Sequence, residues 1–139
     1  LTDMVQGINA ILPPIINALF DNSLVVKLSM YDEVKQVGGR NNIRIISKIS
    51  LDITMDGEEF SVHMLSGGEK DRISFAITVA LCKIVGSPIM MLDEAFSSIS
   101  NDAKAEAIQL VKTQCPGITI LSIAHDGVDG EYDRRLILT

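Results

Sequence analysis

Apolar residues among the first twenty positions recur every three or four residues, which is the spacing of one face of an α-helix. This pattern predicts a helix over residues 2–19. Two consecutive prolines, Pro13 and Pro14, fall inside it, and proline lacks the N–H group that a helix interior uses. We therefore expect this helix to bend or divide at the prolines and to stop near Asp21.

The pattern then changes to an alternation of apolar and polar residues, which is the period of a β-strand. Alternation over residues 24–37 and 42–55, on either side of Gly38 and Gly39, predicts a long β-hairpin. Asp56-Gly57 supplies a second turn, and residues 60–63 are expected to add a short antiparallel strand.

From Ser66 onward the chain alternates between helical and strand patterns, an order typical of a parallel α/β layer. The predicted elements are a helix that follows Ser66 and ends at Gly86, a strand over 89–92, a helix over 102–114, a strand over 118–124 and an edge strand over 135–138. The predicted fold class is therefore α/β, with an antiparallel hairpin region followed by a parallel α/β core.

Length and charge narrow the class of protein. The 139 residues suit one domain, or one lobe of a larger one, and a hydrophobic content of 47% with 22% charged residues indicates an ordered chain. The net charge of −6 argues against a generally basic nucleic-acid-binding domain. Arg40, Arg44 and Lys48 form a small basic stripe if they share a strand face, although such a stripe more often is a solvated face.

The cysteines and the lengths of the apolar runs indicate in which cellular compartment the protein is expected. Cys82 and Cys115 are isolated from each other in the sequence and have apolar neighbours, so they are expected to be buried thiols rather than a zinc site or a disulfide. Every apolar run is far shorter than the roughly 20 residues that span a bilayer, and Asp3 stands where a leader would be basic. We expect an intracellular protein of the cytoplasm or nucleoid, or of the nucleus in a eukaryote, with no membrane partner.

The segment Leu65-Ser66-Gly67-Gly68-Glu69 is the first candidate for chemistry. Ser-x-x-Glu is a helix capping box, and that structural role alone accounts for Ser66 and Glu69. A cap does not need two glycines, whereas close approach of a backbone to a phosphate at the positive end of a helix does. The segment can cap the helix and also bind a phosphate, because the two roles are compatible.

Acidic and histidine side chains follow the two predicted buried strands. Asp93 and Glu94 end the first, where ligands bind in open α/β sheets. Asp93 suits Mg²⁺, and Glu94 suits a role in orienting or deprotonating an attacking water; two ordinary surface acids are the alternative. His125 directly follows the second strand, where it is either structural or a hydrogen-bond donor to a γ-phosphate.

One element of nucleotide chemistry is missing from the sequence. No stretch reads G-x-x-x-x-G-K-[ST], the loop whose backbone N–H groups and lysine hold nucleotide phosphates. The chain therefore carries only half of the residues that an ATP-hydrolysing site needs.

The block from residue 65 to residue 125 resembles the C-terminal lobe of an ABC-type ATPase, and specifically the SMC and SbcC branch that handles DNA. Residues 65–69 match the ABC signature, residues 89–94 the Walker B strand, residues 95–100 the D-loop with Ser97 and Ser98, and His125 the switch histidine. Two positions depart from the common pattern: Ser100 stands where the D-loop usually ends in Asp, and Glu69 replaces the Gln of transporters.

The resemblance implies a domain organisation and site roles. Residues 1–21 would end a coiled-coil exit helix, and residues 22–139 would form the lobe, with antiparallel strands over 22–64 and the motifs over 65–139. Glu94 and His125 would be catalytic and Asp93 would hold Mg²⁺. Ser66, Gly67, Gly68 and Glu69 would contact ATP bound by a second copy of the head.

The implied cofactors are ATP and Mg²⁺, and the implied partners are an N-terminal Walker A lobe of the same protein, a second head, a nuclease subunit and DNA. The expected function is ATP hydrolysis by an SbcC-like head in DNA double-strand-break repair or recombination, with the isolated fragment inactive for lack of the Walker A loop. Two alternatives stay open: an SMC-type chromosome ATPase without a nuclease, and a non-catalytic module that docks on another protein.

Overall fold

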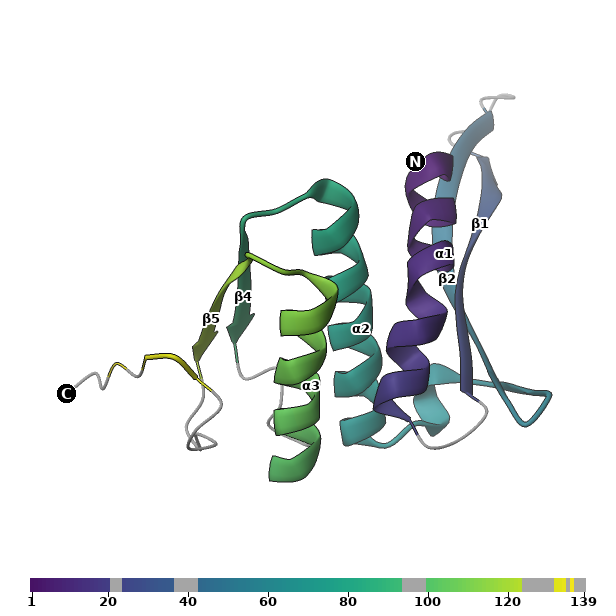
Figure 1. Ribbon diagram of the computed structural model, residues 1–139. Coiled ribbons are helices and arrows are strands. Elements are labelled where there is room, and N and C mark those ends of the chain that lie inside the picture. The colour runs from purple at the N-terminus through teal and green to yellow at the C-terminus, as the bar shows by residue number, and fades with distance from the viewer. Residues whose placement is uncertain (21–23, 37–42, 94–99, 124–131, 135, 137–139) are drawn as a thin grey trace.

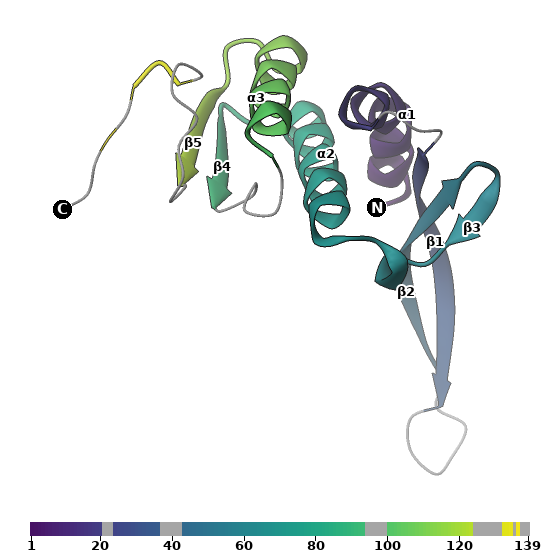
Figure 2. The ribbon, with the colours of Figure 1, turned by 90° about the horizontal axis from the view of Figure 1, so that it is seen from below.

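The computed structural model describes residues 1–20, 24–36, 43–93, 100–123, 132–134 and 136. Three helices form a layer between two separate sheets, which confirms the predicted α/β class (Figures 1 and 2). The elements are α1 (Thr2–Leu19), β1 (Leu24–Gln36), β2 (Ile43–Met55), β3 (Glu58–Phe60), the 3₁₀ turn η1 (Val62–Met64), α2 (Gly67–Val85), β4 (Ile89–Asp93), α3 (Asn101–Gln114) and β5 (Thr119–Ile123).

Helix α1 is continuous through Pro13 and Pro14, so, of the expected bend or division, the prolines do not cause division. Both prolines lie on the exposed side of the helix. The carbonyls that lose their donors are those four residues earlier, at Asn9 and Ala10, and water reaches that side. Leu12, Ile15 and Ile16 are fully buried on the opposite side, and their packing holds the helix across the missing bonds.

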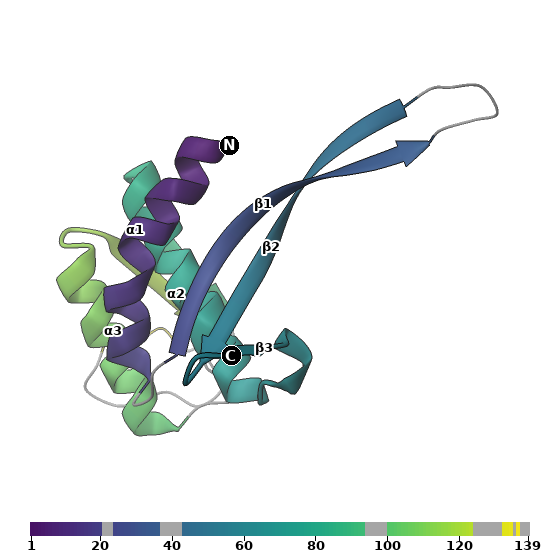
Figure 3. The ribbon, with the colours of Figure 1, turned by 90° about the vertical axis from the view of Figure 1, so that its right-hand side faces the viewer.

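The hairpin of β1 and β2 matches the predicted pattern. The strands pair antiparallel from Leu24 opposite Met55 to Gln36 opposite Ile43. Figure 3 shows this ribbon extending well past the end of α1 that carries the N-terminus. The third strand differs from the prediction: β3 occupies residues 58–60, and residues 62–64 form a 3₁₀ turn whose His63 N–H donates to Ser61 Oγ at 3.3 Å.

The second sheet consists of β4 and β5, paired parallel from Ile89 opposite Thr119 to Asp93 opposite Ile123. Helix α2 ends as predicted at Gly86, whose left-handed φ of 65° suits glycine. The expected edge strand over 135–138 lies outside the described residues apart from Leu136.

One hydrophobic core joins the helical layer to both sheets. Buried side chains of α1, α2 and α3 pack with Leu24, Val26 and Ile53 of the hairpin and with Met90 and Leu92 of β4. Asn9 of α1 adds a polar link, because its side chain accepts from the Leu28 N–H and donates to the Leu28 carbonyl, both at 2.8 Å. Within the described part of the chain, no helix is long and apolar enough to cross a membrane.

Candidate functional site

The signature segment forms a complete capping box at the start of α2. Ser66 Oγ accepts a hydrogen bond from the Glu69 N–H at 3.3 Å, and Glu69 Oε2 accepts from the Ser66 N–H at 2.7 Å. The Ser66 hydroxyl also donates to Glu69 Oε2 at 2.7 Å. These bonds from Ser66, side chain first and then backbone, lower the pKa of Glu69, because they stabilise its carboxylate.

Gly67 and Gly68 form the first turn of α2 in ordinary helical conformation, without positive φ. The backbone therefore does not require glycine at either position. Ser66 engages the N–H groups of Glu69 and Lys70, and no hydrogen bond from the N–H of Gly67 or Gly68 occurs among the described residues. Two N–H donors without a partner among the described residues thus lie at the positive end of a helix, where an anion is stabilised.

Asp93 is the last residue of β4 and is exposed. A hollow of about 340 Å³ lies beside it between α2 and β4. The hollow is lined by Asp71, Ser74, Phe75 and Thr78 from α2 and by Met91, Leu92 and Asp93 from β4. Asp71, Ser74 and Thr78 line this hollow, and the sequence motifs did not single them out.

The two described motifs do not line a common hollow. Ser66 does not line the hollow next to Asp93. Helix α2 begins and β4 ends toward the same end of the molecule, since the two elements run in opposite directions (Figure 1). The other predicted site residues, Glu94, Ser97, Ser98 and His125, lie outside the described residues.

The donor atoms around Asp93 suit a hard cation. Asp71 and Asp93 both line the hollow, and carboxylate oxygens are the ligands that Mg²⁺ prefers. Mg²⁺ commonly uses one or two protein carboxylates and completes its coordination with water and phosphate. Among the described residues no group of three His, Cys, Asp or Glu side chains forms a self-sufficient metal cage. The residues present therefore fit a magnesium ion that shares its coordination with a phosphate ligand.

One face of the parallel strand pair has no cover among the described elements. Met90 and Leu92 are buried toward the helices, whereas their neighbours point the other way and are exposed. The exposed fractions are 46% for Ile89, 68% for Met91, 49% for Leu121 and 59% for Ile123. Because side chains alternate along a strand, Asp93 lies on this same open face.

Ser100, the position that departs from the common D-loop pattern, caps helix α3. Its Oγ accepts from the Ala103 N–H at 3.4 Å. Serine and aspartate are comparable N-cap residues, so Ser100 caps the start of α3 as an aspartate would.

Arg72 orients the start of α2 and was not predicted from the motifs. Its Nη1 donates to the Leu19 carbonyl at 3.0 Å, and its guanidinium lies 5.1 Å from the centre of the Phe20 ring. The side chain thereby ties the helix that carries the signature segment to the end of α1.

The basic stripe is only partly described. Arg44 and Lys48 share one face of β2, and Arg40 lies outside the described residues. Lys48 forms an ion pair with Glu33 across the hairpin, so its charge is locally balanced. The hydrogen bond to Glu33, and then the charge of Glu33, raise the pKa of Lys48.

No protein-family model matches the chain. Protein 050L of Invertebrate iridescent virus 6 is 26% identical over 142 residues, which cover 99% of this chain and 14% of that protein. The thiamine import ATP-binding protein ThiQ of Jannaschia sp. (strain CCS1) is 30% identical over 136 residues, which cover 88% of this chain and 57% of ThiQ. The chain thus spans between about a seventh and somewhat more than half of these relatives.

Two solved structures are similar in fold. The Smc head domain of Pyrococcus furiosus, bound to the C-terminal domain of ScpA, superposes with a TM-score of 0.63 at 15% identity over 86% of this chain and 28% of that chain. A structure described as concerning ATP-driven dimerization and DNA stimulated activation of SMC ATPases gives 0.61 at 16% identity over 88% and 69%. The fold is that of the head lobes of SMC and ABC ATPases.

Proposed function

We propose that this chain is the signature-bearing half of an ATPase head, which hydrolyses ATP after it joins a Walker A lobe and pairs with a second head. The observation that carries this proposal is the open apolar face of β4 and β5, with Asp93 at its carboxyl end. Parallel sheets occur almost only with both faces covered, and here α2 and α3 cover one face. A second lobe on the open face would bury these side chains and bring a phosphate-binding loop toward Asp93.

Similar proteins support an ATP-dependent role. ThiQ is named as an ATP-binding protein, and one of the similar head structures is described by its ATP-driven dimerization. The relatives are longer than this chain, which agrees with a lobe that works as part of a larger head.

The proposed roles within one head follow from the chemistry of each side chain. Asp93 is proposed to hold magnesium at the hollow that Asp71 also lines. The ion, when bound, neutralises charge on the phosphates. Glu94 orients or deprotonates the attacking water, and His125 donates a hydrogen bond to the γ-phosphate.

The signature residues serve the nucleotide of the partner head. Gly67 and Gly68 present N–H groups at the positive end of α2. The Ser66 hydroxyl donates to Glu69 Oε2 and is proposed to turn to the partner's phosphate when the nucleotide binds. Their separation from the hollow at Asp93 supports contact with a different nucleotide. Ser97 and Ser98 of the D-loop are proposed to contact the other head across the dimer.

Among ATPase heads, we propose that this one is SbcC-like and acts in DNA double-strand-break repair or recombination with a nuclease partner. The SMC-type chromosome ATPase is equally compatible with the similar head structures. The segment that joins the two lobes separates these classes, because a C-x-x-C metal hook is typical of SbcC and a hinge domain of SMC proteins.

Measuring the association of the two lobes tests whether the open face of β4 and β5 is their interface. Met91→Glu places a charge on the proposed interface, whereas Val25→Glu makes the same change at a 58% exposed position on the hairpin. We expect Met91→Glu to abolish binding of the Walker A lobe of the same protein in isothermal titration calorimetry and Val25→Glu to leave it unchanged. Equal binding by both variants would contradict the proposed interface.

Dimerisation tests the role of the signature residues. A head with Ser66→Arg is expected to bind ATP normally and to stay monomeric on a sizing column, because the arginine blocks the partner's nucleotide. Normal ATP-driven dimers of this variant would refute contact in trans. If the lobes bind each other but the assembled head binds no nucleotide, the chain is a docking module instead.

A further inference from the structure

Cys82 and Cys115, which lie far apart in the sequence, line one hollow. A hollow of about 350 Å³ opens where α2 and α3 end, at the opposite end of α2 from its N-cap Ser66. Cys82 and Lys83 of α2 line it together with Gln114 and Cys115 at the end of α3. Both thiols are reduced and half-buried.

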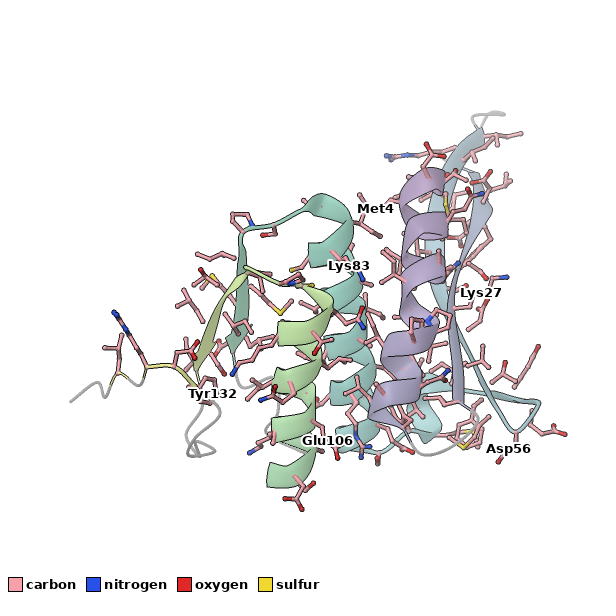
Figure 4. The ribbon with its side chains drawn as sticks, viewed as in Figure 1. Met4, Lys27, Asp56, Lys83, Glu106 and Tyr132 are labelled. Atoms are coloured by element: carbon pink, nitrogen blue, oxygen red, sulfur yellow. The ribbon has the colours of Figure 1, made fainter. Side chains whose placement is uncertain are left out.

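Two hydrogen bonds lie next to the thiols, one between side chains and one in the backbone. Lys83 Nζ donates to Gln114 Oε1 at 2.9 Å, and these two residues are the chain neighbours of Cys82 and Cys115. Figure 4 shows Lys83 near the upper ends of α2 and α3. The Cys115 N–H caps α3 by donating to the Val111 carbonyl at 2.8 Å. The ends of the two helices are thus joined by a side-chain bridge that flanks the cysteines.

The charges around the hollow agree with this proximity. Burial raises the pKa of Cys82 and, as the largest effect, that of Cys115. The Lys83 ammonium lowers the pKa of Cys115, and a negative charge on Cys82 raises it. A thiolate at one cysteine would therefore act electrostatically on the other.

We propose that Cys82 and Cys115 are a reversible redox modification site, at which oxidation joins the two thiols in one intramolecular disulfide. A small disulfide such as oxidised glutathione supplies the oxidant. The thiolate of one cysteine attacks it and releases one glutathione thiolate; the thiolate of the other cysteine then attacks the mixed disulfide and releases the second. The protein loses two protons and two electrons, and one disulfide is reduced to two thiols.

The bond would fasten the ends of two helices whose starts carry other roles. Helix α2 begins at the signature segment and α3 begins at Ser100, so the disulfide fixes one helix relative to the other at the end remote from those residues. Formation of the bond does not rest on ATP hydrolysis by the protein.

Intact-mass measurement of the full chain tests the proposal. The protein is incubated with oxidised glutathione, then denatured and treated with N-ethylmaleimide. We expect a monomer that has lost two hydrogens, takes up no maleimide and yields one cross-linked peptide containing both cysteines. Two stable glutathione adducts, two maleimide adducts or a disulfide-linked dimer of chains would each overturn the proposal.

Single variants and unfolding provide the controls. Cys82→Ser and Cys115→Ser are each expected to carry one glutathione and to lose no further hydrogens. In concentrated urea the rate of ring closure from the mixed disulfide should fall at least about tenfold, because the fold no longer holds the thiols together. An unchanged rate in urea would show that the fold contributes nothing, and it would refute the inference even if a variant fails to fold.

Discussion

Asn9 is predicted to fasten the hairpin to the helical layer. Its side chain bonds both backbone groups of Leu28, with donor–acceptor distances of 2.8 Å. Leu28 and Leu51 are partners in β1 and β2. Since the Leu28 N–H and carbonyl bond Asn9, they face the edge of β1 away from β2, and Asn9→Ala leaves both without these partners.

The expected loss follows from the two bonds. Each contributes about 1 kcal/mol net, and more where the freed group stays shielded from water. Alanine has a higher helix propensity than asparagine, which offsets roughly half a kcal/mol of this loss in stability. We therefore expect Asn9→Ala to lower the free energy of unfolding by about 1.5 to 2 kcal/mol.

Urea unfolding followed by circular dichroism measures this loss. Asn17→Ala is the matched control, because Asn17 is an exposed asparagine in the same helix and carries the same gain in helix propensity. Asn9→Ala should be less stable than Asn17→Ala by about 2 kcal/mol. A difference below about 0.5 kcal/mol would refute the structural role of Asn9, because surface substitutions vary within that range.

Three further predictions concern helix α2 and are tested by the same unfolding measurement. Ser66→Ala removes the N-cap and should cost about 1 kcal/mol at neutral pH. Because the folded-state pKa of Glu69 lies below its ordinary value of 4.5, the part of the cap's stabilisation that comes from the Glu69 carboxylate should be lost as the pH falls through that folded pKa. The bond from the Glu69 N–H to Ser66 Oγ remains, so the difference between wild type and Ser66→Ala should shrink in stronger acid, and an undiminished difference would contradict this. Arg72→Leu should cost about 1 to 2 kcal/mol through the lost bond to Leu19 and the lost contact with Phe20, whereas the exposed Arg134→Leu should be neutral. Gly86→Ala should cost about 1 kcal/mol because Gly86 has a left-handed φ, and an unchanged stability would show that α2 ends differently.

Elements with a strict local period were predictable from the sequence. The alternation of β1 and β2 fixes which side chains share a face, and a hairpin of antiparallel strands follows from the glycines between them. The capping box was likewise predictable, because its two partners, Ser66 and Glu69, are three residues apart in the sequence.

Features that depend on contacts between distant elements were not predictable. Proline usually interrupts a helix because it lacks an N–H group, yet α1 continues through Pro13 and Pro14. Burial of the opposite side of α1 stabilises the helix there. The approach of Cys82 to Cys115 depends on how α2 packs beside α3, which no spacing in the sequence encodes. For the same reason the hollow that joins Asp71 to Asp93 emerged only from the fold.

The most direct test of the central proposal is ATP turnover by the head assembled from this chain and the Walker A lobe of the same protein, compared with the same assembly carrying Glu94→Gln. We predict turnover by the first and its loss in the second, with ATP binding retained by both. Turnover unchanged by Glu94→Gln would contradict the catalytic role of this residue, and an assembled, ATP-bound head without turnover would contradict the proposed ATPase.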